Sequence, residues 1–584
     1  AIEATTGAAA AASTSQQVIS SKTTTYMFRS TFKSSDWYGE LIRQTIDSKT
    51  GEVPEVSNWD DCPADVCDWS ARKQLNALVD TASDTRSIYT YDPTNDATRL
   101  KDFAWASLTD AEKKLFVSPQ IDSLTQFADF DAADKAAAEG ANLVAFLRGQ
   151  RGYEGKYYRT RKSVLGDIVS SEAVYVTTPP YSYGDQGYTA FATAQATRKA
   201  VVYVGSNDGM LHAFDVDTGK ELWAYVPSHV LPKLYNLADT KYSDKHTFFV
   251  DGSPVVGDAC VSNCGTDSAV WKTILVGGLN AGGRGYYALD ITDPAKPKAL
   301  WEFTYDTSKG AGYTTDADLG FTFGNPIITK RVDGTWVVLV TSGYNNVSPG
   351  SGEGVLFVLD AAKGEKMTTK DASAGRIGTG VGSDTSPVSG ACSTPPCPSG
   401  LAMISAWADS ARTDNTTTQV YGGDLYGNLW RFDINDTLGV AGYDAQHLAT
   451  FQTGADQVPP KARQPVAVPP ELAEIDGQAV IFVGTGKLLG DSDLGDTMPQ
   501  SMYAIKDTLG TEDWDVVRGR DDMVQQTLKV DGDVMTGTSL PVDWKDKIGW
   551  FFDLPRSGER ANTQPALARG ILVFNTNQPQ TSTC

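Results

Sequence analysis

The stretch Ala213-Phe214-Asp215 ends a run of β-branched and aromatic residues, and a phrase of the same kind returns four times along the chain. The copies follow at intervals of 75, 70, 73 and 73 residues. Regular self-similarity of this kind is typical of a repeat architecture. The copies are Ala288-Leu289-Asp290, Val358-Leu359-Asp360, Arg431-Phe432-Asp433 and Ala504-Ile505-Lys506, where Lys506 takes the aspartate position and Asp507 follows.

Each copy divides into four short segments rich in β-branched and aromatic residues. In the clearest copy they are residues 253–256, 274–277, 286–290 and 300–303, separated by Gly, Asn, Asp and Pro. This pattern predicts an antiparallel meander, and repeated four-stranded meanders form the blades of a β-propeller. A proline opens the first strand of each copy, where its missing N–H is tolerated. These prolines are Pro254, Pro326, Pro387, Pro465 and Pro565.

The repeats predict an all-β propeller of about seven blades. One further copy begins near residue 173, and the last ends at about residue 574. We expect residues 1–22, rich in Ala, Ser and Thr, to be a flexible linker, and residues 23–584 to be one domain with blades from about 165 to 584. The strands near Tyr26 to Gln44 would pair with the last blade. The repeats exceed the roughly 40 to 45 residues of a WD40 blade, so we expect function in the long loops.

A helical insertion is predicted over residues 60–150. Thr109 is followed by Glu112 at the spacing of a capping box. A second helix is expected over residues 133–147, where the sequence is rich in alanine and has periodic apolar positions.

Composition excludes some classes of function. The net charge of −22 argues against nucleic acid as a partner, because phosphates would be repelled. No segment approaches the roughly 18 to 20 apolar residues of a membrane helix, so the chain is not expected to span a membrane. The chain begins at Ala1 without Met or a signal segment, so we expect it to be processed or a fragment.

Six of the seven cysteines form three close pairs in loops. Local pairs of this kind suit disulfides made in an oxidising compartment. Zinc is the alternative, but the spacings are not C-x-x-C and no histidine accompanies them. Cys584 is left over, and we expect it to be unpaired here. The pairs are Cys62/Cys67, Cys260/Cys264 and Cys392/Cys397.

No catalytic constellation is recognisable. The four histidines lack a second ligand at metal-binding spacing, and the chain contains no G-x-S-x-G elbow. Oxygen-rich loops are candidates for calcium, with turn formation by Asp and Asn as the alternative. These loops contain Asp316/Asp318, Asp491/Asp493/Asp496 and Asp409/Asp414/Asn415.

Three phrases, at residues 421–433, 161–169 and 249–254, are together similar to the C-terminal domain of the PilC/PilY family of type IV pilus biogenesis factors and tip-associated adhesins. The first is the stretch Tyr421-Gly422-Gly423-Asp424-Leu425-Tyr426-Gly427-Asn428-Leu429-Trp430-Arg431-Phe432-Asp433. The others are residues 161–169 and 249–254, and the stretch 201–215 resembles quinoprotein-type repeats. The resemblance runs from about Thr24 to the end of the chain. It implies a propeller preceded by an N-terminal region that often contains a von Willebrand A-like module.

The sequence departs from the resembled family at two motifs. The family's calcium loop, D-x-[DN]-x-D-x-x-x-D, corresponds here to Ser410, Arg412, Asp414 and Thr418, so only Asp414 keeps a carboxylate. Asp409 and Asn415 are the other oxygen donors of this degenerate loop. Some members carry Arg-Gly-Asp after the second helix, a ligand for integrins. Here the position reads Arg148-Gly149-Gln150, which lacks the carboxylate.

The resemblance implies a non-enzymatic domain for pilus biogenesis and tip adhesion. Its partners would be minor pilins or the pilus machinery and a host or abiotic surface. Its location would be the pilus tip or outer-membrane surface, reached through the periplasm. The alternatives are a quinone-dependent dehydrogenase and an envelope assembly scaffold. We expect no quinone, because such enzymes typically use adjacent cysteines and none are present.

Overall fold

The computed structural model describes residues 24–56, 62–63, 65–367, 375–382, 397–437, 445–459, 461–510, 518–532 and 534–579, and the backbone of 12–14. The chain forms two compact units. The first comprises Ala1–Thr315 and Ala362–Gly364, and the second comprises Asp316–Ala361 and Glu365–Cys584.

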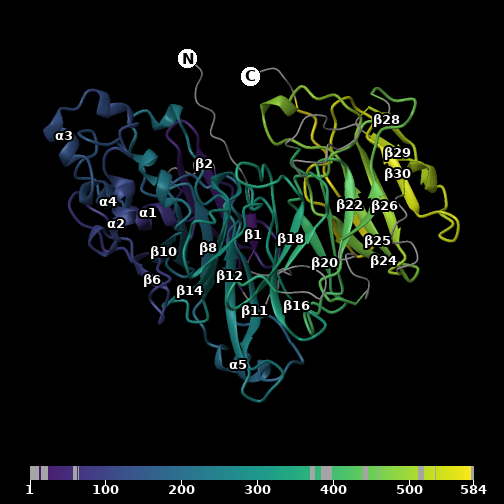
Figure 1. Cartoon of the computed structure of the whole chain (residues 1–584), viewed down its shortest axis with the longest axis horizontal. Helices are drawn as coiled ribbons and strands as arrows, with labels where there is room; N and C mark the ends of the chain where they lie inside the picture. Colours follow the sequence, from purple (N-terminus) through teal and green to yellow (C-terminus); the bar gives the residue numbers. More distant parts are fainter. Residues whose placement is uncertain are drawn as a thin grey trace. The chain divides into compact units, whose positions relative to one another are not determined.

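Five sheets follow one plan, in which four strands pair antiparallel in chain order (Figure 1). The predicted meander of four strands per copy is therefore confirmed. In the first unit the strands are β7 (Val174–Val176), β8 (Val201–Ser206), β9 (Met210–Asp215) and β10 (Glu221–Val226), then β11 (Val255–Ser262), β12 (Val270–Gly277), β13 (Gly285–Asp290) and β14 (Lys298–Thr304). In the second unit they are β16 (Ile327–Lys330), β17 (Trp336–Thr341), β18 (Val355–Asp360) and β19 (Arg376–Gly378), then β20 (Ile404–Trp407), β21 (Gln419–Gly423), β22 (Asn428–Phe432) and β23 (Ala445–Thr450), then β24 (Glu471–Ile475), β25 (Gln478–Gly484), β26 (Ser501–Asp507) and β30 (Gly549–Asp553).

Three of these sheets continue beyond their fourth strand. The strand next to the fourth strand runs parallel to it in every case. An added strand satisfies backbone groups that an edge strand would leave open. The added strands therefore cover the outer edge of three of the five sheets. The added strands are β5 (Ile88–Tyr91) with β6 (Leu100–Asp102), β15 (Tyr313–Thr315) and β27 (Met523–Gln525), and a separate hairpin is formed by β28 (Leu528–Asp531) and β29 (Val534–Gly537).

The repeated aspartate closes the turn after the third strand. Its carboxylate accepts a hydrogen bond from the backbone N–H two residues later, which makes an Asx turn. This bond is 2.8 Å at Asp215, 3.1 Å at Asp290 and 2.8 Å at Asp433. In the fifth copy Asp507 does the same at 2.9 Å, so Asp507 and not Lys506 is the equivalent residue. The expected alignment of that copy was wrong by one residue.

The N-terminal strands lie in a sheet of their own. β2 (Thr25–Lys33) and β3 (Tyr38–Ile46) pair with each other and with β1 (Ala12–Thr14) and β4 (Trp69–Ser70). The last copy forms a separate hairpin of β31 (Ala566–Ala568) and β32 (Ile571–Val573). The expected pairing of β2 and β3 with the last copy is therefore wrong among the described strands. The segment around β4 provides a local partner, because the Ser70 hydroxyl donates to the buried Glu40 carboxylate at 2.6 Å.

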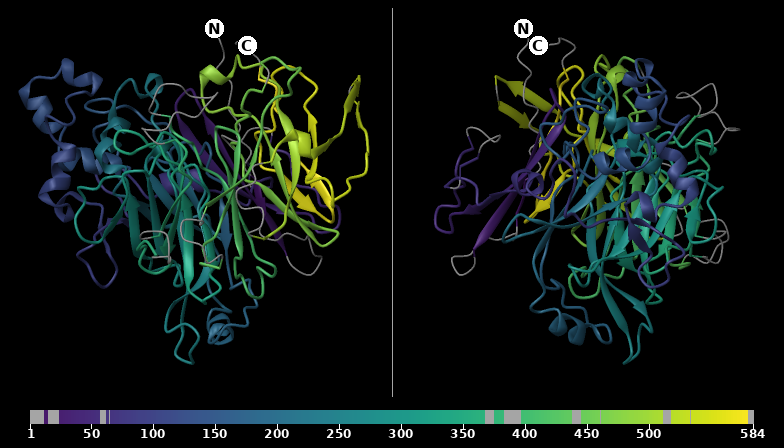
Figure 2. Two further views of the ribbon diagram at one scale, coloured as in Figure 1. Left: turned by 45° about the vertical axis from the view of Figure 1, so that its right-hand side comes forward. Right: turned by 90° about the vertical axis from the view of Figure 1, so that its left-hand side faces the viewer.

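Short helices lie together in the insertion of the first unit (Figure 2, blue). The capping box is confirmed, since Thr109 and Glu112 exchange backbone and side-chain hydrogen bonds at the start of α2 (Asp110–Lys113). The single helix expected over 133–147 is wrong. Gly140 has φ +66° and donates its N–H to the Phe116 carbonyl at 2.8 Å, which separates α3 (Ala132–Ala137) from α4 (Ala141–Leu147). The other helices are α1 (Ala71–Asn76), α5 (Tyr188–Ala194), and the 3-10 helices η2 (Trp105–Ser107), η3 (Lys114–Phe116), η4 (Thr125–Ala128), η5 (Leu231–Ala238), η6 (Tyr242–Asp244), η7 (Asn280–Gly282), η8 (Asp491–Asp493) and η9 (Arg520–Asp522).

A buried charge network joins the insertion to β9 and β10. Arg86, just before β5, pairs with Glu221 through two nitrogens at 2.7 and 2.8 Å. His212 lies between Glu221 at 2.7 Å and Asp208 at 3.1 Å. Burial alone would lower the pKa of His212, but Asp208 and Glu221 raise it to about 9. The two cations and two carboxylates balance, which makes their burial tolerable.

Arg86→Met should lower the free energy of unfolding by about 3 to 5 kcal/mol, because Glu221 would stay buried without its main partner. Lys101→Met is the matched control. It removes the Lys101–Glu112 pair, whose two side chains keep some exposure, and should cost clearly less than Arg86→Met. Urea denaturation followed by circular dichroism measures both. Equal losses in the two variants would contradict the role assigned to the network.

The stability of the protein should fall between pH 6.5 and 9 on account of His212. Its pKa is raised in the folded state, so its stabilisation is full below pH 6.5 and is lost as pH rises toward 9. One proton gives a slope of at most about 1.4 kcal/mol per pH unit. His212→Gln should remove this slope in urea denaturation. His447→Gln should keep it, because burial lowers the pKa of His447 to about 4 and its own effect lies below pH 6.5.

Candidate functional site

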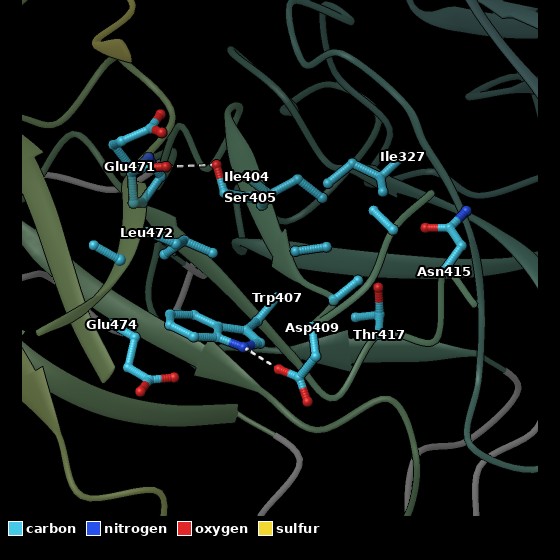
Figure 3. Close-up of a pocket in the computed structure, with 15 residues that line it drawn as sticks. Ile327, Ile404, Ser405, Trp407, Asp409, Asn415, Thr417, Glu471, Leu472 and Glu474 are labelled. Carbon is cyan, nitrogen blue, oxygen red and sulfur yellow. Dashed lines mark hydrogen bonds between the residues drawn. The ribbon is translucent and has the colours of Figure 1, made fainter. Parts of the chain in front are cut away.

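A cavity of about 740 Å³ lies within the second unit, between β20 and β24 (Figure 3). Ile404 to Asp409 form one wall, and Pro470 to Glu474 form the other. Ile327 from β16 completes the lining, together with Ala411, Asn415 and Thr417 from the loop before β21. A cavity of this size falls within the range of small-ligand sites.

The cavity meets the edges of two strands. Side chains alternate between the two faces of a strand, so a cavity lined by consecutive residues contacts the strand edge. β20 and β24 are each the first strand of their sheet and pair on one side only in the described ladders. The sequence predicts that β24 starts at Pro465. Instead Pro470 precedes β24, and Val466 makes an isolated bridge with Gly486.

Polar side chains fix the shape of this site. The Ser405 hydroxyl donates to the Pro470 carbonyl at 2.6 Å and so links the two walls. The indole N–H of Trp407 donates to the Asp409 carboxylate at 2.7 Å. Figure 3 shows the Asp409 and Glu474 carboxylates on the same side of the indole, with Glu471 farther along β24. Trp407, Glu471 and Glu474 were missed by sequence reasoning. It placed the starts of these two strands at Pro387, which lies outside the described residues, and at Pro465, whereas β20 begins at Ile404 and β24 at Glu471.

The cavity carries three carboxylates and no basic lining residue. Within the described ranges, no Lys or Arg side chain forms an ion pair with Asp409, Glu471 or Glu474. Burial raises the pKa of Glu471, and its carboxylate accepts a hydrogen bond from the Leu567 N–H at 3.3 Å. The site is therefore negative at neutral pH, with an aromatic and aliphatic floor.

The three predicted calcium ligands each contact a different group of the protein. Asp409 accepts from Trp407, whereas Asp414 forms an ion pair with Lys330 at 2.7 Å. The Lys330 hydrogen bond lowers the pKa of Asp414. Asn415 uses its side-chain amide to donate to the Ile328 carbonyl at 3.2 Å. The loop is thus held to β16 by protein contacts.

The two other acidic loops also hold cationic side chains. Arg376 contacts both Asp316, at 2.6 Å, and Asp318. In the second loop, Asp493 pairs with Lys487. No group of three or more His, Cys, Asp or Glu side chains suited to a metal occurs in the part of the chain that the structure describes.

The Arg148-Gly149-Gln150 segment is built into the packing of the insertion. Arg148 and Gln150 both donate to Asp84, the latter at 2.9 Å. Gly149 has φ +118°, and a Cβ there would approach a Val164 methyl to 2.9 Å. These side chains converge on Asp84 and do not form a projecting loop.

Two of the predicted disulfides are present, Cys62–Cys67 and Cys260–Cys264, each with a Cα–Cα distance of 5.8 Å. Cys397 is also disulfide-bonded. Cys392 and Cys584 lie outside the described residues.

Comparison with known proteins decides the family. Residues 165–539 match the PilY1 beta-propeller domain.

The chain belongs to the PilY1 propeller family.

The β-propeller fold class is thereby confirmed. The chain is 32% identical over 587 aligned residues to the type IV pilus biogenesis factor PilY1 of Pseudomonas aeruginosa strain PAK, with 92% of this chain and 45% of that protein covered. It is 31% identical to a PilY1 homolog of Xylella fastidiosa, with 95% and 39% covered. The chain therefore spans less than half the length of these relatives.

A solved structure supports the same family. The crystal structure of the Pseudomonas aeruginosa PilY1 C-terminal domain matches with a TM-score of 0.53 and 26% sequence identity, covering 69% of this chain and 83% of that one. Among the described residues, no helix has the length and apolar character needed to cross a membrane.

We predict that the loop from Asp409 to Thr418 binds calcium no more tightly than about 10⁻⁴ M. Lys330 already pairs with Asp414, and Arg412 and Thr418 replace ligands of the resembled motif. Isothermal titration calorimetry with calcium would measure this. A micromolar site that Asp414→Ala abolishes would contradict the prediction. The triple variant Ser410→Asp/Arg412→Asp/Thr418→Asp restores the motif and serves as positive control.

Proposed function

We propose that this chain is the propeller domain of a type IV pilus biogenesis factor and that it works by binding, without catalysis. The match of residues 165–539 to the PilY1 propeller carries this proposal. The relatives named above are type IV pilus biogenesis factors. An accessible cavity bordered by strand edges is suited to holding a partner.

The contacts of His212 and His246 favour a binding function over acid–base catalysis. His212 is enclosed by Asp208 and Glu221 in the buried network. His246 pairs with Asp167 at 2.9 Å and stacks on Trp37. Imidazoles are common acid–base groups in enzymes. These two are held by structural contacts, and both residues lie far in sequence from the residues that line the cavity.

We infer the partners and location from the family alone. The domain would contact minor pilins or other pilus machinery, and a host or abiotic surface, at the pilus tip or the outer-membrane surface. It would need neither quinone nor calcium for this binding. Pilus biogenesis is the general function that we propose, and adhesion is the more specific one.

Deletion of residues 24–584 from the parent gene should reduce surface piliation, twitching and adhesion, because the binding domain is removed. Immunoblots of sheared pili, twitching zones and attachment counts measure these effects, with a full-length copy in trans as control. Normal performance in all three assays would refute the proposal. Quinone-dependent dye reduction by the purified chain would instead favour the dehydrogenase alternative.

A further inference from the structure

We propose that the cavity between β20 and β24 binds an extended peptide segment that carries a lysine or arginine. This inference rests on the proposed binding function and names the chemistry of one partner. Three observations carry it: the strand edges at the cavity, its uncompensated carboxylates and its half-buried indole.

The strand edges favour an extended chain as occupant. β20 and β24 line the cavity with consecutive residues, so their edges and not only their faces are presented. An exposed strand edge offers backbone N–H and C=O groups that an added strand can pair with. Ser405 holds the two walls together through the Pro470 carbonyl, so the cavity is formed before the partner arrives.

The charges favour a cation on that chain. Asp409 and Glu474 are exposed and lie on the same side of the Trp407 indole. A lysine or arginine placed over the indole would gain a cation–π contact and lie near both carboxylates. An anionic segment would be repelled by the same groups.

The apolar lining favours an alternating peptide. Ile404 and Leu472 line opposite walls, and Leu472 is half-buried. Successive residues of an extended peptide point to opposite sides, so basic and β-branched residues in alternation would meet the carboxylates and the aliphatic groups respectively. Such a segment on a pilus component would fit the site.

Fluorescence anisotropy with a labelled hexapeptide of alternating lysine and valine would test this on the 584-residue chain. Saturable binding is expected, and a peptide of alternating glutamate and valine should not bind. Glu474→Gln should weaken binding about two- to fivefold, as expected for a partly exposed ion pair. Trp407→Ala should weaken it about threefold or more.

Asp476→Asn is the matched control, because it removes one negative charge just beyond β24 without altering the cavity lining. It should leave the affinity unchanged at constant ionic strength. Trp407→Phe keeps an aromatic ring and guards against a folding defect in Trp407→Ala. Equal weakening by Asp476→Asn and Glu474→Gln, absence of binding, or equal binding of the glutamate peptide would overturn the proposal. Displacement of the peptide by equimolar spermidine would assign the site to a small polycation and also overturn it.

The two proposals fail in different ways. If deleting residues 24–584 abolishes piliation but the lysine peptide does not bind, only the cavity proposal fails. If the peptide binds as expected and the deletion leaves piliation, twitching and adhesion normal, the proposed pilus function is refuted. The proposal that the cavity binds a basic peptide then still stands.

Discussion

In the repeats that contain Asp215, Asp290, Asp433 and Asp507, this aspartate sets the turn after the third strand. Its carboxylate holds the backbone N–H two residues later and so reverses the chain toward the fourth strand. Asp507 also accepts from Tyr421 at 2.8 Å and Arg431 at 2.7 Å, residues of the preceding sheet. The same side chain therefore closes a turn within one sheet and joins two neighbouring sheets of the second unit.

The sheets differ in which of their edge strands are covered by an added strand. In three of them the fourth strand is covered by a parallel strand, which comes from a connection of the repeats at β15 and β27 and from the N-terminal insertion at β5. The first strands β20 and β24 have no such cover in the described ladders. A partner that adds a strand to β20 or β24 would meet the carboxylates and the Trp407 indole there.

The fold could be predicted from the sequence further than the site could. Strand segments and the capping box at Thr109 depend on local residue patterns, and these were confirmed. The break at Gly140 was missed because alanine-rich composition masked the positive φ that separates α3 from α4. The cavity was missed because its walls come from strands about 65 residues apart, and no local pattern brings Trp407 next to Glu474. The sequence also left open whether the acidic loops bind calcium. Their carboxylates pair with Lys330 and Arg376, and these cations are distant in sequence.

The position of Asp84 limits what the Arg148-Gly149-Gln150 segment can become during evolution. Gln150 donates to Asp84 through its amide, and Arg148 already neutralises that carboxylate. An aspartate in place of Gln150 would exchange a hydrogen-bond donor for a second negative charge beside Asp84. In this chain an Arg-Gly-Asp sequence at residues 148–150 would therefore lower the stability of the fold unless Asp84 were replaced as well.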